Sequence, residues 1–182
     1  MNIDMIVKFI MSLWTSGTTA STSNSKSLPL ASSPTVKEPE LKKVDGYYIW
    51  DKGYEYPLTD HFSTREFTCQ CSHESCKEQR ISIDLVDKLE KIRVEVGQPL
   101  IITSGFRCSA HQQDIRDSGQ STVVAVKKST HELGDAADIL PKDGKEIQGS
   151  FLKLCAQHFD SIGLSDRFLH VDQRVGLRRW NY

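Results

Sequence analysis

Residues 129–138, with the sequence STHELGDAAD, place His131 and Asp138 seven residues apart, with Gly134 and two alanines between them. Imidazole nitrogens and carboxylate oxygens are donors that Zn²⁺ takes in proteins. Glycine and alanine let the chain turn tightly past an ion. The segment therefore indicates half of a metal site, although a polar loop that leads into a strand has the same composition.

A second histidine lies further along, in the strand-like run RFLHVD at residues 167–172. Side chains alternate along a strand, so His170 and Asp172 share one face while their apolar neighbours take the other. A catalytic zinc takes three protein ligands and leaves a fourth position for water. His131, Asp138 and His170 supply such a set, but each of them alone is also a common structural residue.

Two helices are predicted from apolar residues that recur at helical spacing. The first covers residues 82–97, where Ser82 is a suitable N-cap and Gly97 ends the helix. The second starts near Asp143. Asp143 and Glu146 have the spacing of a capping box, with aspartate in place of the usual serine or threonine. Its apolar face consists of Ile147, Phe151, Leu154 and Cys155.

Short apolar runs predict strands at residues 100–103 and 135–140. Residues 161–164 and 167–173 predict a closing hairpin with its turn at residues 165–166. The order is helix, strand, loop, strand, helix and hairpin. This order indicates an α+β fold with a small central antiparallel sheet and flanking helices.

The first 43 residues are expected to lie outside the folded domain, which we place at residues 44–182. Residues 1–14 form an apolar leader, which is either a signal or anchor or a poorly defined segment. Residues 15–43 form a flexible linker rich in serine and threonine. No stretch approaches the roughly 20 apolar residues of a membrane span. The net charge of −1 offers no basic excess for nucleic acid.

Five cysteines are an odd number and do not indicate a complete disulfide framework. Cys69, Cys71 and Cys76 lie close together in CQCSHESC, at a spacing that differs from the paired cysteines of a zinc ribbon. A second, structural metal and a disulfide, with Cys108 as the partner, both stay open. Cys155 is expected to be a small buried hydrophobic residue.

The pattern S-x-H-x-x-G-x-A-x-D, followed about thirty residues later by H-x-D, resembles the zinc D-alanyl-D-alanine carboxypeptidase superfamily. That group includes bacterial cell-wall dipeptidases, phage L-alanyl-D-glutamate endopeptidases and the hedgehog signalling domain. The segments LTDHFSTREFTC, LVDKLEKIRVEVGQPLIITSGFRC and FLHVDQR also resemble its small carboxypeptidase-like branch, in the same order. The resemblance covers roughly residues 56–180.

The resemblance implies a zinc cleft on the sheet, with His131, Asp138 and His170 as the metal ligands. It also implies that Arg107 lies near the scissile carbonyl, where a guanidinium stabilises an oxyanion. The alternative for Arg107 is a surface ion pair. Ser129 is expected to contact substrate, with a loop-capping hydroxyl as the alternative.

The general base is the part of the pattern that this chain does not match. Family members with an acidic base carry it three residues before the last ligand, and here that position is Arg167. Members with H-x-H use a histidine two residues before the ligand, and here that position is Phe168. Asp172 is the favoured candidate for the base and Asp166 is the alternative. His111 either lines the site or packs its helix.

The resemblance implies a zinc metallopeptidase that hydrolyses peptide bonds of peptidoglycan stem peptides, and we expect a monomer. Carboxypeptidase and endopeptidase types share the metal pattern, so the bond that is cut stays open. We expect the protein to act at the cell wall, in the periplasm or outside the cell. The sequence leaves open whether the source is a bacterium or a phage. The alternative is a non-catalytic zinc-holding module that recognises cell-wall peptide.

Overall fold

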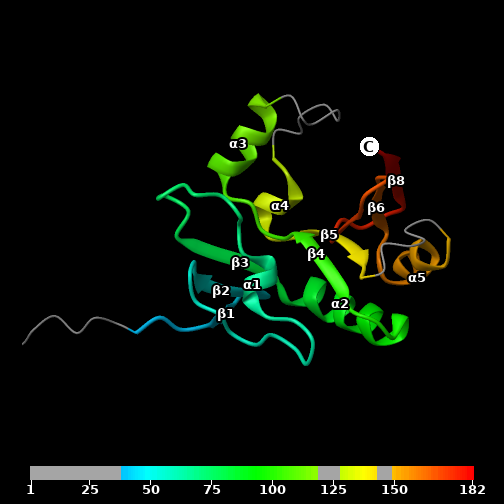
Figure 1. Cartoon of the computed structure of the whole chain (residues 1–182), viewed down its shortest axis with the longest axis horizontal. Helices are drawn as coiled ribbons and strands as arrows, with labels where there is room; N and C mark the ends of the chain where they lie inside the picture. Colours follow the sequence, from blue (N-terminus) through cyan, green and yellow to red (C-terminus); the bar gives the residue numbers. More distant parts are fainter. Residues whose placement is uncertain (1–37, 119–127, 143–148) are drawn as a thin grey trace, which may run out of the picture. The chain divides into compact units, whose positions relative to one another are not determined.

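A computed structural model of the chain describes residues 38–118, 128–142 and 149–182. The chain divides into two units, residues 1–36 and 37–182, and all described residues belong to the second. This unit combines helices with two sheets and has the predicted α+β fold (Figure 1). The leader and most of the linker lie outside the described residues, and the first strand begins at Lys42.

The described helices and strands follow one another in an irregular alternation. The helices are α1 (Thr64–Phe67), α2 (Ile83–Val96), α3 (Ser109–Asp117), α4 (Thr130–Leu133) and α5 (Ser150–His158). The strands are β1 (Lys42–Val44), β2 (Tyr47–Asp51), β3 (Glu78–Ser82), β4 (Leu100–Ser104), β5 (Ala136–Pro141), β6 (Ser161–Leu164), β7 (Leu169–Asp172) and β8 (Arg178–Asn181).

The larger sheet has five strands in the order β4-β5-β7-β6-β8. Its first four strands pair antiparallel, as predicted, and β6 and β7 form the predicted hairpin. The edge strand β8 pairs with β6 in parallel, which the sequence analysis did not anticipate. Asp138 on β5 lies directly opposite His170 on β7, so both side chains project from the same face.

A smaller antiparallel sheet of β1, β2 and β3 was not predicted. Its strands have three to five residues, and all three residues of β1 are exposed, so β1 lacks the alternation that indicates a half-buried strand. The sheet nevertheless contributes Trp50 and Ile81 to the main hydrophobic core. The backbone N–H of Ser82, at the end of β3, donates to the Gly134 carbonyl at 2.8 Å. The small sheet thus supports the segment that carries His131.

Helix α2 has the predicted capped ends. The Ser82 hydroxyl accepts a hydrogen bond from the Leu85 N–H at 3.3 Å, and Gly97 ends the helix in the left-handed conformation at φ 68°. Its buried face consists of Leu85, Val86, Leu89 and Ile92. Helix α2 contacts α5, and both supply residues to the core. The helix therefore packs in the same core as Ile139 of β5 and Leu169 of β7, the strands that carry two of the predicted ligands.

Helix α5 begins at Ser150, after Gly149, which makes no side-chain cap. The capping-box start predicted at Asp143 and Glu146 lies outside the described residues. Cys155 is fully buried in the core, as predicted for a small hydrophobic residue. Within the described residues, no helix combines the length and the apolar character needed to cross a membrane.

Replacing the N-cap of α2 tests the account of that helix. Ser82→Ala removes the hydroxyl that satisfies the Leu85 N–H and should lower the free energy of unfolding by about 1 kcal/mol. Urea denaturation monitored by circular dichroism measures the change. Ser109→Ala, at the exposed start of α3, is the matched control and should stay within about 0.5 kcal/mol. Equal effects of the two substitutions would contradict the capping role.

Candidate metal centre

Three predicted ligands, His131, Asp138 and His170, converge in the structure. Asp138 Oδ1 lies 2.9 Å from His170 Nδ1 and 3.3 Å from His131 Nε2. The two ring nitrogens are 3.1 Å apart. All three residues are buried, with exposed fractions of 2 to 4%. Two imidazoles and a carboxylate thus meet at one point beneath the surface.

His131 Nε2, Asp138 Oδ1 and His170 Nδ1, here called the donor triangle, are spaced to suit a zinc ion. Zinc–nitrogen and zinc–oxygen bonds of about 2.0–2.1 Å imply tetrahedral edges of about 3.3 Å. The three observed separations lie at or slightly below that length. The donor types are those of a catalytic zinc site, and three protein ligands leave one position for water or substrate.

A single helical turn positions His131. Ser129 is the N-cap of helix α4, and its hydroxyl accepts a hydrogen bond from the His131 N–H at 3.3 Å. Glu132 completes a capping box by accepting from the Ser129 N–H at 3.1 Å. Gly134 ends the turn in the left-handed conformation at φ 77°. Ser129 is therefore the capping hydroxyl in this structure, and its predicted contact with substrate stays a prediction.

The second nitrogen of each histidine has a partner that fixes the ring. His131 Nδ1 lies 2.6 Å from the Gly105 carbonyl, so it donates there and leaves Nε2 free to bind a metal. His170 Nε2 lies 3.1 Å from Asp172 Oδ2, which leaves Nδ1 free. Such partners set the orientation and tautomer of metal-binding histidines. The geometry of both rings therefore suits metal binding.

The charges of the three groups are strongly coupled. Burial opposes ionisation of Asp138, but the two histidines hold the pKa of its carboxyl well below its usual range. Burial lowers the pKa of His131. Burial also disfavours protonation of His170, but hydrogen bonds to Asp138 and Asp172 outweigh it and raise its pKa. The carboxylate is thus available as a ligand, and a metal bound at His170 would compete with a proton there.

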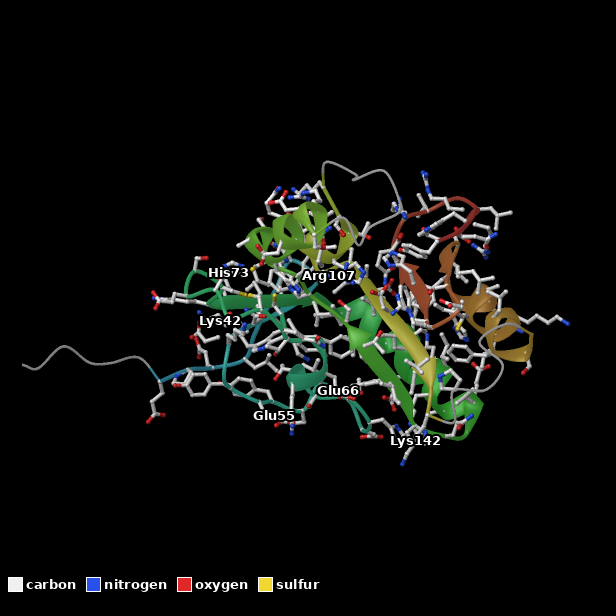
Figure 2. The ribbon with its side chains drawn as sticks, turned by 45° about the horizontal axis from the view of Figure 1, so that its top comes forward. Lys42, Glu55, Glu66, His73, Arg107 and Lys142 are labelled. Atoms are coloured by element: carbon white, nitrogen blue, oxygen red, sulfur yellow. The ribbon has the colours of Figure 1, made fainter. Side chains whose placement is uncertain are left out.

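Arg107 directly contacts Asp138, one of the three predicted ligands. Its Nη2 donates to Asp138 Oδ2 at 2.5 Å and its Nε donates to the Ser104 hydroxyl at 2.8 Å. Its side chain is 17% exposed, so the ion pair is largely buried rather than on the surface. Arg107 lies beside the start of α3 (Figure 2). It holds one carboxylate oxygen so that the other faces the histidines.

The two candidates for the general base have contrasting environments. Asp172 is fully buried, and its oxygens accept hydrogen bonds from His170 and from the Arg174 guanidinium at 2.6 Å. It contacts the His170 nitrogen that points away from the donor triangle. Asp166 lies in the β6–β7 turn with 90% of its side chain exposed, beside Ser165. Asp172 therefore acts here as the partner that orients His170, and a role for either residue as base stays a prediction.

Aromatic residues near His170 were missed by the sequence analysis. The Trp180 and Tyr182 rings lie 5.4 and 6.3 Å from the His170 ring, and Arg174 lies over Trp180. Burial and the Asp138 carboxylate raise the pKa of Tyr182 to about 12, so its phenol keeps its proton. The two aromatics at alternate positions in the final RRWNY were the available signal.

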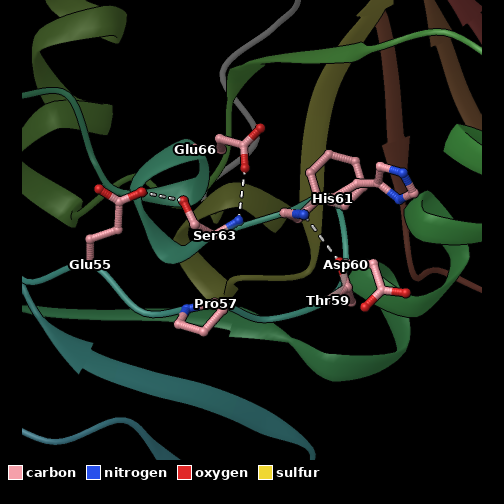
Figure 3. A pocket seen from close by; sticks show the side chains of 8 residues that line it. Glu55, Pro57, Thr59, Asp60, His61, Ser63 and Glu66 are labelled. Atoms are coloured by element: carbon pink, nitrogen blue, oxygen red, sulfur yellow. Dashed lines mark hydrogen bonds between the residues drawn. The ribbon is translucent and has the colours of Figure 1, made fainter.

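Two other features lie apart from the donor triangle. His111 Nδ1 contacts the Cys69 sulfur at 3.2 Å, so this residue belongs to a cysteine-rich region and not to the metal ligands. A hollow of about 360 Å³ in the loop before α1 is lined by polar and acidic residues (Figure 3). Its lining residues are Glu55, Pro57, Thr59, Asp60, His61, Phe62, Ser63 and Glu66. None of the predicted site residues lines this hollow.

Comparison with known proteins gives one family. The family model described as Peptidase M15 matches residues 60–172. This segment includes the three ligands, Arg107 and Asp172. No curated protein and no solved structure matches the chain.

Gly134 is expected to matter for both stability and metal binding. An added Cβ would require a strained left-handed residue and would lie 2.8 Å from the Arg80 carbonyl oxygen. Gly134→Ala should therefore lower the free energy of unfolding by about 2 kcal/mol or more and weaken zinc binding about tenfold. Gly97→Ala is the matched control because it has a similar φ but nothing within 4 Å of the added atom. It should cost about 1 kcal/mol. Unchanged zinc affinity in a folded Gly134→Ala chain would contradict the account.

The orienting role of Asp172 is tested by Asp172→Asn. The neutral amide does not balance the charge of Arg174 and does not fix the orientation and tautomer of His170 as the carboxylate does. Zinc affinity should therefore fall about 10- to 100-fold. Competition with a chromogenic chelator measures the affinity. Asp166→Asn, on the exposed turn, is the control and should bind zinc as the wild type does. Equal affinities of the two variants would show that Asp172 does not support the ligand.

Proposed function

The chain belongs to the peptidase M15 family, and we propose that it is a zinc-dependent peptidase acting on peptidoglycan stem peptides. Peptidases of this family are metal-dependent. The observation that carries the proposal is the buried convergence of His131, Asp138 and His170 in a geometry that suits Zn²⁺. We assign the ion to Nε2 of His131, Oδ1 of Asp138 and Nδ1 of His170.

Zinc in such a site supplies a Lewis acid that polarises the scissile carbonyl and activates a water molecule for attack. The chain must hold the ligands still and support the charge that develops. The Gly105 carbonyl and Asp172 fix the two imidazole rings. These contacts keep the donor triangle in place without movement during the reaction.

Arg107 is the residue to which we assign stabilisation of the developing oxyanion. Its guanidinium lies against the outer oxygen of Asp138 and is partly exposed. A permanent cation beside the metal ligands, in a site of limited solvent access, favours negative charge on the substrate carbonyl oxygen. Tyr182 keeps its phenolic proton and is a further hydrogen-bond donor on the side of Trp180.

The substrate class rests on the resemblance to the small carboxypeptidase-like branch of cell-wall peptidases. The absence of a basic excess is consistent with a peptide rather than a nucleic-acid substrate. We infer a monomer that acts at the cell wall, in the periplasm or on the extracellular side. A carboxypeptidase would remove the terminal D-alanine, whereas an endopeptidase would cut within the stem peptide.

The test is incubation of the zinc-loaded full chain with purified peptidoglycan and with a synthetic stem pentapeptide. Mass spectrometry of the products identifies the bond that is cut. His131→Ala should lose zinc and lower kcat/KM by more than about 100-fold. This is more than the loss expected when a residue that only orients a ligand, such as Asp172, is replaced. His61→Ala is the matched control because this exposed histidine pairs with Glu90, away from the ligands. Release of neither D-alanine nor a peptide from either substrate would contradict the proposal.

A second candidate function is a non-catalytic module that holds zinc and binds cell-wall peptide. It is favoured by the environment of Asp172, whose oxygens are engaged by His170 and Arg174. Calorimetric titration with the same pentapeptide separates the two functions. Saturable binding without cleavage, at full zinc occupancy, would support the module over the enzyme.

A further inference from the structure

Four cysteines form a second cluster of potential metal ligands. The sulfur atoms of Cys69, Cys71, Cys76 and Cys108, here called the cysteine cluster, all lie within 4.8 Å of one another. The Cys71 sulfur is 3.5 Å from that of Cys69 and 3.6 Å from that of Cys108. The fifth cysteine, Cys155, lies in the main core and is not part of this cluster.

The cysteine cluster joins two segments that are distant in the sequence. Three of its members come from the loop between α1 and β3, and Cys108 is the N-cap of α3. Cys69, Cys76 and Phe106 form a small buried group separate from the main core. Outside the cluster, His73 Nε2 lies 2.6 Å from Asp114 Oδ2 of α3, and this contact also connects the loop to the helix.

The sulfur separations suit a metal ion better than disulfides. A disulfide bond is about 2.05 Å long and pairs two sulfurs exclusively. The five cysteines are all free in the structure. Zinc–sulfur bonds of about 2.3 Å imply tetrahedral edges of about 3.8 Å. Four sulfurs in mutual proximity, two of them in contacts of 3.5 and 3.6 Å with Cys71, fit such a tetrahedron.

Every sulfur in the cluster has a nitrogen donor. The Cys108 N–H donates to Cys69 and the His111 N–H donates to Cys108, both at 3.4 Å. The other two sulfurs, those of Cys76 and Cys71, receive hydrogen bonds from side chains. Gln79 Nε2 donates to Cys76 at 3.4 Å and Lys52 Nζ donates to Cys71 at 3.7 Å.

These donors are arranged to favour thiolates. Gln79 is fully buried and its carbonyl oxygen accepts the Cys69 N–H at 2.8 Å, so its amide is fixed toward the sulfurs. The Lys52 ammonium offsets part of the negative charge that four thiolates would carry. Hydrogen bonds to ligating groups are a regular feature of protein metal sites.

The proximity of the four sulfurs itself favours a cation. Four thiolates within 4.8 Å of one another would repel strongly, and a bound divalent cation removes this repulsion.

We infer that the cysteine cluster binds a structural Zn²⁺ ion, separate from the His131–Asp138–His170 centre. Four thiolates complete a tetrahedral shell and leave no position for substrate, which is the arrangement of structural zinc sites. The ion would cross-link the loop after α1 to the N-terminus of α3.

This cross-link would also support the His131–Asp138–His170 centre. Cys108 directly follows Arg107, and the Gly105 carbonyl that orients His131 belongs to the same turn. The Phe106 N–H in this turn donates to the Phe67 carbonyl at 2.9 Å, next to the cysteine loop. Loss of the cross-link should therefore make the positions of the Arg107 and His131 side chains less fixed. Only this effect on activity rests on the proposed peptidase function.

The test is the metal content of the full chain, purified reduced, with zinc supplied and without chelators. Elemental analysis should find about two zinc ions per wild-type chain. The double variant Cys71→Ser, Cys108→Ser removes the two less buried ligands and should keep about one ion, as should His131→Ala. Cys155→Ala is the matched control and should keep about two. Equal zinc content in the wild type and the double variant would overturn the inference.

A second measurement avoids dependence on whether the double variant folds. In the His131→Ala chain, replacement of zinc by Co²⁺ should give an intense thiolate-to-cobalt charge-transfer band and strong visible absorption. A mercurial reagent that blocks thiols should release the ion stoichiometrically. Cobalt spectra without thiolate bands, iron in place of zinc, or an intact mass reduced by disulfide formation would each overturn the inference. If the wild-type chain binds two zinc ions but cleaves neither peptidoglycan nor the stem pentapeptide, that result would count against the proposed peptidase function and not against the cysteine site.

Discussion

The register between β5 and β7 is the constraint on which the metal centre depends. Asp138 lies opposite His170 in this antiparallel pair, and their side chains share one face of the sheet. The next pair, Ile139 and Leu169, is fully buried on the other face. A shift of one residue would expose these apolar side chains and turn the ligands into the core. Packing of the hydrophobic core therefore fixes the separation of two ligands.

The buried charges form one connected network. Arg174 pairs with Asp172, Asp172 orients His170, and His170 contacts Asp138, which pairs with Arg107. An isolated buried charge is costly, and removal of one partner from a buried pair typically costs about 3–5 kcal/mol. Each member therefore depends on its neighbours. The network explains how a carboxylate and two imidazoles are held together beneath the surface.

The sequence allowed prediction of those parts that depend on local patterns. Capping residues defined α2, and the motif in residues 129–172 identified three residues that converge, namely His131, Asp138 and His170. The parts that were missed depend on contacts between distant segments. Strand β8 carries no apolar alternation, and its parallel pairing with β6 depends on the packing of Trp180 over Gly163. Similarly, the spacing of the loop cysteines left a disulfide and a metal open, because the proximity of Cys108 arises only in the folded chain.

The central claim is that His131, Asp138 and His170 bind zinc, and anomalous X-ray diffraction above the zinc absorption edge tests it most directly. Crystals of the chain purified without chelators should give a strong anomalous peak within bonding distance of His131 Nε2, Asp138 Oδ1 and His170 Nδ1. The peak should disappear in data collected below the edge. An absence of anomalous density at these three donors, in protein saturated with zinc, would contradict the account.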